Sequence, residues 1–205
     1  MDDEIGVGDA CHRLPSSRGR SNGMITAEQS AEHVQDVHSL AAAFFAPDQL
    51  GKLTAVGQFD LPAEYATLLA HSGHMTITLE AWHESLVDVH VEGEVFAGDT
   101  YARHSLLTRR TDGRVVQSGI MRIDLTGLPE QVRTAIELGE CPLGRILIRS
   151  NLLREVEPLA LWRIASGTLL AEELATEPAE VIYGRTARIL VEGRPAVELL
   201  EIVRP

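Results

Sequence analysis

The chain has little that would serve a metal, a disulfide or a membrane. It contains two cysteines, Cys11 and Cys141, whose separation fits neither a metal-binding nor a redox spacing. No stretch approaches the ~18 consecutive apolar residues of a membrane span. The opening Met-Asp-Asp-Glu lacks the apolar run of a secretory signal. These absences predict a cytoplasmic protein, in a reducing compartment, with no membrane span.

Positive charge is also scarce. The chain has 18 Lys and Arg against 30 Asp and Glu, a formal net charge of -12. Proteins that bind nucleic acid normally carry a basic excess, so we expect no nucleic-acid partner. An anionic small molecule remains compatible with this balance, because a local cluster of Arg can make a positive pocket inside an acidic protein.

The common cofactor and nucleophile motifs are missing. The sequence contains no Walker loop, no GxGxxG, no GxSxG and no HExxH. His71 and His74 are three residues apart, but Ser72-Gly73 lies between them and breaks any helix face that would aim both at one ion. We therefore expect no metal site, and solvated or locally bonded histidines.

The length and composition suit one ordinary domain. The chain has 205 residues, 44% of them apolar, which is enough for a core without disulfides. Residues 1–23 are rich in Gly, Ser, Arg and Asp, and we expect a disordered tail there. Residues 24–205 form the expected single domain, and Met24 is an alternative start. We expect a monomer or a weak homo-oligomer.

Hydrophobic periodicity and turn residues give the expected order of elements. Asp112-Gly113 and Glu192-Gly193 predict hairpin turns. Helices are expected at 26–45, 61–71, 128–138, from Pro142 onward, and as an excursion within 167–179; strands are expected at 76–82, 87–91, 101–109, 115–125, 152–164, 180–191 and 196–203. Short connections favour antiparallel pairing, so the pattern predicts an α+β domain.

Four short motifs occur in a fixed order along the chain. They are His74-Met75-Thr76, then Tyr101-Ala102-Arg103-His104, then Cys141-Pro142-Leu143-Gly144-Arg145, then Gly193-Arg194-Pro195 followed by Glu198 and Glu201. Each motif alone is weak, and their colinearity is the informative feature. Together they resemble the chorismate pyruvate-lyase family, including its actinobacterial and archaeal branch. The resemblance covers about Leu61 to the C-terminus.

This resemblance implies a fold, an activity and an alternative function without catalysis. The family fold is an antiparallel sheet of about six strands with helices packed on one side and the ligand beneath helical flaps. The implied activity is a lyase that cuts chorismate into 4-hydroxybenzoate and pyruvate without a metal or redox cofactor. The same fold serves the ligand-sensing (UTRA-type) domain of a class of bacterial transcription regulators. The alternative is therefore a non-catalytic domain that binds a small aromatic carboxylate.

The resemblance also assigns roles to individual residues. It implies that Arg103 holds the ring carboxylate of the substrate and that the backbone N–H of Leu143 supports it. It implies that the backbone of Met75 faces the ligand hydroxyl, and that Glu201 meets the same end and takes part in catalysis. Glu198, three residues earlier on the other face of the strand, stays open as the functional acid.

The physical chemistry agrees with an arginine anchor. The guanidinium fork binds a carboxylate through two parallel charge-assisted hydrogen bonds, which suits Arg103 to that role. Chorismate carries a second carboxylate, for which the sequence offers Arg149, Arg154 and Arg163 without choosing among them.

Overall fold

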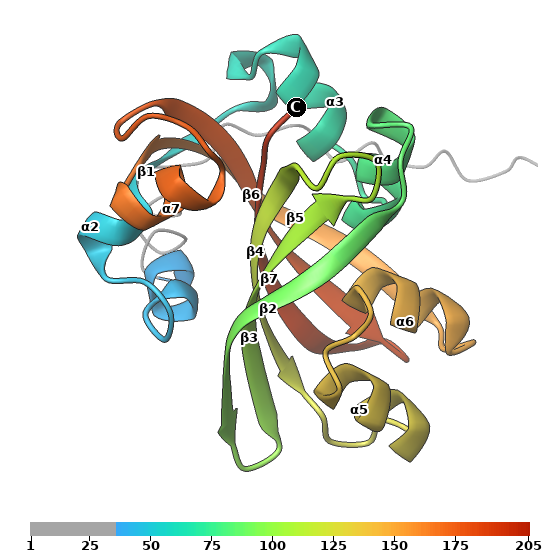
Figure 1. The fold of residues 1–205 in the computed structure, drawn as a ribbon. Coiled ribbons are helices and arrows are strands. Elements are labelled where there is room, and N and C mark those ends of the chain that lie inside the picture. Colours follow the sequence, from blue (N-terminus) through green and yellow to red (C-terminus); the bar gives the residue numbers. More distant parts are fainter. Residues whose placement is uncertain (1–35) are drawn as a thin grey trace, which may run out of the picture.

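The computed structural model describes residues 36–205 and contains one antiparallel sheet of seven strands (Figure 1). The strands are β1 (Gly51–Val56), β2 (Val87–Ala97), β3 (Thr100–Arg109), β4 (Val115–Asp124), β5 (Arg154–Ser166), β6 (Val181–Val191) and β7 (Arg194–Val203). Their order across the sheet is β1-β5-β6-β7-β4-β3-β2. The expected α+β class with an antiparallel sheet is confirmed, with seven strands rather than about six.

The helices match most of the expected positions. They are α2 (Pro47–Leu50), α3 (Ala63–Leu69), α4 (Met75–Trp82), α5 (Glu130–Glu137), α6 (Leu143–Arg149) and α7 (Thr168–Glu173), with a 3-10 turn at Gln58–Asp60. Residues 36–41 are also helical, which is part of the helix expected at 26–45. The expected tail at 1–23, the alternative start at Met24 and the beginning of that helix lie outside the described residues.

The segment 76–82 corrects one expectation, because it forms helix α4 and not a strand. Its alternating Ile77, Leu79 and Ala81 fit a strand, but a segment this short also fits a helix. Met75 and Leu79 lie four residues apart and are both buried, as on one helix face, whereas Ile77 is 51% exposed. The strand that was not expected is β1, which pairs with β5 at the edge of the sheet.

Both faces of the sheet are covered, although helices were expected on one side only. Helices α3 to α6 lie over one face, and residues 36–41, α2 and α7 lie over the other (Figure 1). On the face covered by residues 36–41, α2 and α7, the core packs Val37, Leu40 and Phe45 against Trp162 and Leu200 of the sheet. The inner strand β4 is buried along most of its length, as expected for a strand enclosed on both faces.

Two turns set the register that builds the site. The turns at Asp112-Gly113 and Glu192-Gly193 are present, and Gly113 and Gly193 take positive φ values of 73° and 75° that favour glycine. The second turn returns β7 between β6 and β4 in the middle of the sheet. The last strand of the chain therefore contributes its side chains to the centre of the fold.

Candidate ligand-binding site

The site is built on two neighbouring rows of residues that cross strands β6, β7, β4 and β3. Glu201 of β7 lies opposite Arg185 of β6 on one side and Gly119 of β4 on the other. The neighbouring row contains Leu199, then Met121 of β4, then Arg103 of β3. Residues opposite one another in register share a face, so Arg185, Glu201 and Arg103 all project from the face under α4 and α6.

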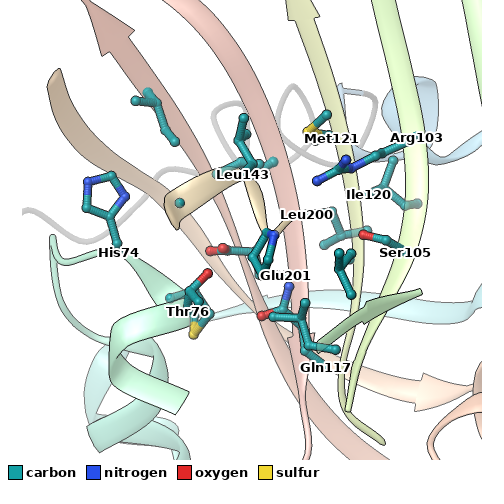
Figure 2. A pocket seen from close by; sticks show the side chains of 18 of the residues that line it. His74, Thr76, Arg103, Ser105, Gln117, Ile120, Met121, Leu143, Leu200 and Glu201 are labelled. Carbon is teal, nitrogen blue, oxygen red and sulfur yellow. The ribbon is translucent and has the colours of Figure 1, made fainter. Parts of the chain in front are cut away.

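These side chains line one pocket between the sheet and the first turns of α4 and α6 (Figure 2). The four residues assigned by the family resemblance, Met75, Arg103, Leu143 and Glu201, all line it, although they come from α4, β3, α6 and β7. The polar and small residues that join them include His74, Thr76, Ser105, Gln117, Gly119, Gly144 and Arg185. The fold thus brings together segments that span most of the described chain.

Arg103 is a buried cation without a salt-bridge partner among residues 36–205. Arg103 is 2% exposed, and its side chain donates long hydrogen bonds of 3.5 Å to the carbonyl of Ile136 and 3.4 Å to that of Cys141. Its Nε is buried without a partner in this part of the chain, and no carboxylate there lies within salt-bridge distance. Burial lowers the pKa of the Arg103 guanidinium, and nearby Tyr101 partly opposes this. A buried charge in this state is stabilised by an anion entering the pocket.

Glu201, in contrast, is already paired. Arg185 Nε donates to Glu201 Oε2 at 2.7 Å, and both side chains are buried. Arg185 also donates to the backbone carbonyl oxygens of His71 at 2.7 Å and Gly73 at 3.2 Å. Arg185 therefore fixes the carboxylate and also the loop that leads into α4.

Sequence reasoning missed Arg185, although one signal was available. Arg185 lies within an expected strand, beside Gly184 and between apolar residues that the structure buries. A charged residue in the middle of an apolar strand needs a partner, and the last strand supplies it in Glu201. Glu198 is instead about half exposed and bonded to Arg122, so the structure places Glu201 in the pocket and Glu198 outside it.

The starts of α4 and α6 close the pocket from above. Leu143 is the first residue of α6, so its backbone N–H lies in the first turn, where no intrahelical acceptor exists. The two helix starts approach closely, because a Cβ added at Gly144 would come 3.0 Å from Thr76 Oγ1. Met75 and Leu143 are both buried and line the cavity from this roof.

The histidines near the pocket are locally bonded. His71 Nδ1 accepts from the Gly73 N–H at 3.0 Å, and His74 Nε2 accepts from Arg154 Nε at 3.2 Å. Burial is the largest cause that lowers the pKa of both imidazoles, and the neighbouring Arg185 and Arg154 add to the effect. Both side chains are therefore neutral near pH 7.

The described part of the chain has neither a metal-binding cluster nor a membrane-spanning helix. Residues 36–205 contain no group of three or more His, Cys, Asp or Glu side chains arranged to hold a metal ion. No helix in this range is long and apolar enough to cross a membrane. Of the three arginines considered for a second carboxylate, only Arg154 lies near the pocket, beside His74, whereas Arg149 and Arg163 are exposed.

Comparison with known proteins gives structural likenesses only. No family model matches the chain, and no curated protein matches it. Among solved structures, PhnF from Mycobacterium smegmatis aligns with a TM-score of 0.47 and 10% identity, over 65% of this chain and 64% of that one. The chain thus spans less than two thirds of the length of that protein.

Two isolated domains align over more of their own length. The effector domain of the same PhnF gives a TM-score of 0.48 and 10% identity, over 64% of this chain and 88% of that one. The ligand-binding domain of a putative GntR-family transcriptional regulator from Bordetella bronchiseptica gives 0.41 and 13% identity, over 58% and 85%. Because these TM-scores are below 0.5, only the pocket itself can indicate the function.

Proposed function

We propose that the pocket binds a small ring compound through a carboxylate held by Arg103. The observation that carries the proposal is the state of this side chain, which is buried and has an unpartnered Nε and no acidic partner within residues 36–205. An arriving carboxylate replaces two long hydrogen bonds to carbonyls with a charge-assisted pair. The amide at the start of α6, on Leu143, is available to the same carboxylate.

The opposite end of the pocket suits a hydroxyl group. Glu201 lies two strands and two residues away from Arg103 on the same face, a Cα separation of about 12 Å from ordinary strand spacings. After both side chains reach inward, the gap between them suits a single six-membered ring. Gly119 lies between them in the register and adds no side chain to the floor. A carboxylate accepts from a ligand hydroxyl, so the ends of the pocket favour a carboxylate at Arg103 and a hydroxyl at Glu201.

The finer proposal is that the bound ring is chorismate and that it is cleaved. The C–O bond from the ring to the enolpyruvyl oxygen breaks, and its electron pair leaves with that oxygen. The proton on the hydroxyl-bearing ring carbon is lost, which leaves 4-hydroxybenzoate. The enolpyruvate gains a proton at its methylene carbon and becomes pyruvate, so atoms and charge balance.

Each residue then has a defined part in the reaction. Arg103 fixes the ring by its carboxylate, and Glu201 fixes the hydroxyl-bearing carbon and can accept its proton. Helices α4 and α6 exclude water and hold a reactive conformer, which is most of what an elimination driven by aromatisation requires. Arg185 is a positioning residue, because it acts by holding Glu201.

A second candidate is binding without turnover, as in a sensor domain. The observation that favours it is the Arg185–Glu201 pair, which already compensates the charge of the carboxylate. A sensor requires Arg103 as an anchor and requires no proton transfer at Glu201.

One experiment tests both proposals. The full chain is incubated with chorismate, and 4-hydroxybenzoate and pyruvate are quantified by chromatography, with the Arg103→Met variant as control. In parallel, the affinity for 4-hydroxybenzoate is measured by calorimetry. Equal amounts of both products support the lyase, and binding without products supports the sensor. Failure of the wild-type chain to bind either compound contradicts the anchor role of Arg103.

A further inference from the structure

A second hollow adjoins the ligand pocket. It lies between the loop that precedes α4 and the start of β5, and Arg154 and His74 are among the residues that line it. It shares two wall residues, His74 and Val156, with the pocket that contains Arg103 and Glu201. The two hollows therefore lie on either side of His74 and Val156.

Arg154 is a half-buried cation without an acidic partner in residues 36–205. Its Nε donates to His74 Nε2 at 3.2 Å and its Nη1 to the carbonyl of Leu152 at 3.1 Å. No carboxylate in that range lies within salt-bridge distance of it. The adjacent Glu155 also lines this hollow, but its carboxylate makes no salt bridge with Arg154. Nη2 of Arg154 thus remains available to an incoming anion.

His74 adds a second donor at the boundary between the two hollows. Because Nε2 accepts from Arg154, the proton of the neutral imidazole is on Nδ1. Nδ1 lies on the side of Gly144, 3.7 Å from the place that a Cβ there would occupy. Figure 2 shows the ring at the edge of the pocket, near Leu143 and away from Arg103. Arg154 and His74 therefore offer N–H groups at the end of the pocket opposite Arg103.

We propose that Arg154 and His74 form a second anion subsite, which binds a carboxylate on a side arm of the ligand whose ring carboxylate is held by Arg103. This inference rests on the proposed function and deepens it, because it assigns the second carboxylate of the ligand to named residues of this chain. A bound carboxylate on Arg154 gains the charge-assisted hydrogen bond that the guanidinium otherwise lacks. Arg103 still binds the carboxylate on the ring.

A matched pair of stable ligands tests the subsite. The monocarboxylate is 4-hydroxybenzoate, and the dicarboxylate is 3-(carboxymethoxy)-4-hydroxybenzoate, which adds an ether arm with a carboxylate and is already aromatic. Affinities are measured by calorimetry on the full chain. We expect wild type to bind the dicarboxylate more tightly, and Arg154→Gln to lose ~10–100-fold for that ligand, as for one charge-assisted hydrogen bond. The affinity of Arg154→Gln for 4-hydroxybenzoate should stay within about two-fold of wild type.

The control is Arg163→Gln, on the same strand but exposed, which should leave both affinities unchanged. The subsite is overturned if wild type binds the dicarboxylate no more tightly than 4-hydroxybenzoate, a comparison that requires no variant. It is also overturned if Arg154→Gln loses both ligands equally, which would indicate a structural role. If wild type binds neither ligand, the proposed function itself fails, and that result is distinct from both of these.

Discussion

Arg185 and Glu201 face one another on the adjacent strands β6 and β7, with 2.7 Å between Arg185 Nε and Glu201 Oε2 and both side chains buried. The remaining donors of Arg185 bind the backbone of the loop between α3 and α4. One ion pair therefore joins the floor of the pocket to the segment that carries Met75 and His74. This arrangement couples the stability of the fold to the shape of the site.

Arg185→Met should be strongly destabilising, because it leaves Glu201 buried and unpaired. Losing one member of a buried pair typically costs ~3–5 kcal/mol, whereas replacing both members with apolar residues is often neutral. We expect the double variant Arg185→Met, Glu201→Met to recover most of the loss in urea unfolding. The control is Arg188→Gln, because Arg188 and its partner Glu157 are both partly exposed. This variant should lower the free energy of unfolding by less than ~1 kcal/mol. Equal losses in the two single variants would contradict the role of burial.

Arg103→Met should weaken ligand binding without lowering the stability of the ligand-free protein. Removal of an unpaired buried cation leaves the free energy of unfolding of the ligand-free protein unchanged or higher. The affinity for 4-hydroxybenzoate should fall by ~2–5 kcal/mol, because the bound carboxylate loses its partner. Arg103→Lys should recover only part of the affinity, since a point charge does not reproduce the fork. Calorimetry with thermal unfolding of the same samples measures both effects, and wild-type affinity in Arg103→Met would refute the anchor.

Glu201→Gln should lower turnover of chorismate by ~10²–10⁴-fold, the usual range for a general acid–base group. Product affinity should change much less. Glu198→Gln is the matched control, because it lies three residues away, is half exposed and pairs with Arg122 outside the pocket. Steady-state kinetics on both variants gives the comparison. If chorismate is cleaved at the wild-type rate by Glu201→Gln, the proton-transfer role is wrong and catalysis is conformational.

Gly119→Ala should fold but bind ligand poorly. A Cβ at this position would come 2.7 Å from Gln117 Nε2, the end of a flexible side chain, and 3.8 Å from the backbone oxygen of Leu200. The added methyl lies on the floor between Arg103 and Glu201, and Gln117, which must move, also lines the pocket. We expect a small change in melting temperature and a ~10-fold weaker affinity for 4-hydroxybenzoate, as for ~1.4 kcal/mol of lost contact. Unchanged affinity would show that the ring does not lie over Gly119.

The stability of the protein should fall as the pH drops below about 6.5. Burial lowers the pKa of His71, His74 and His83 from the ordinary value of 6.5. The unfolded chain therefore binds these protons at a higher pH than the folded chain, so stability decreases between 6.5 and the lower folded pKa values. Asp88, Asp112 and Asp124 have pKa values lowered from 3.8, so their loss occurs in a separate, more acidic range. Melting temperatures from pH 7.5 to 5 check this, and His83→Gln should flatten the slope without altering the pocket.

The order of elements could be predicted from the sequence because turns and strand alternation depend on residues that are close together in the chain. Asp112-Gly113 and Glu192-Gly193 need positive φ at glycine, and the alternating apolar residues of the run that forms β2 indicate a period of two. The α4 segment could not be predicted in this way, because eight residues of mixed pattern fit either period. Its helical state follows from packing of Met75 and Leu79 against the sheet.

The sequence by itself determined which residue types the site could use, including the candidate anchor Arg103 and the candidate carboxylate Glu201. Only the tertiary structure decided that Glu201 and not Glu198 enters the pocket, that Arg185 is its partner, and that Arg154 lies beside the pocket. The physical reason is the sheet order, in which the last strand β7 lies between β6 and β4. Pairing between distant strands sets which charges are buried together, and that pairing depends on long-range register, which short segments of sequence do not encode.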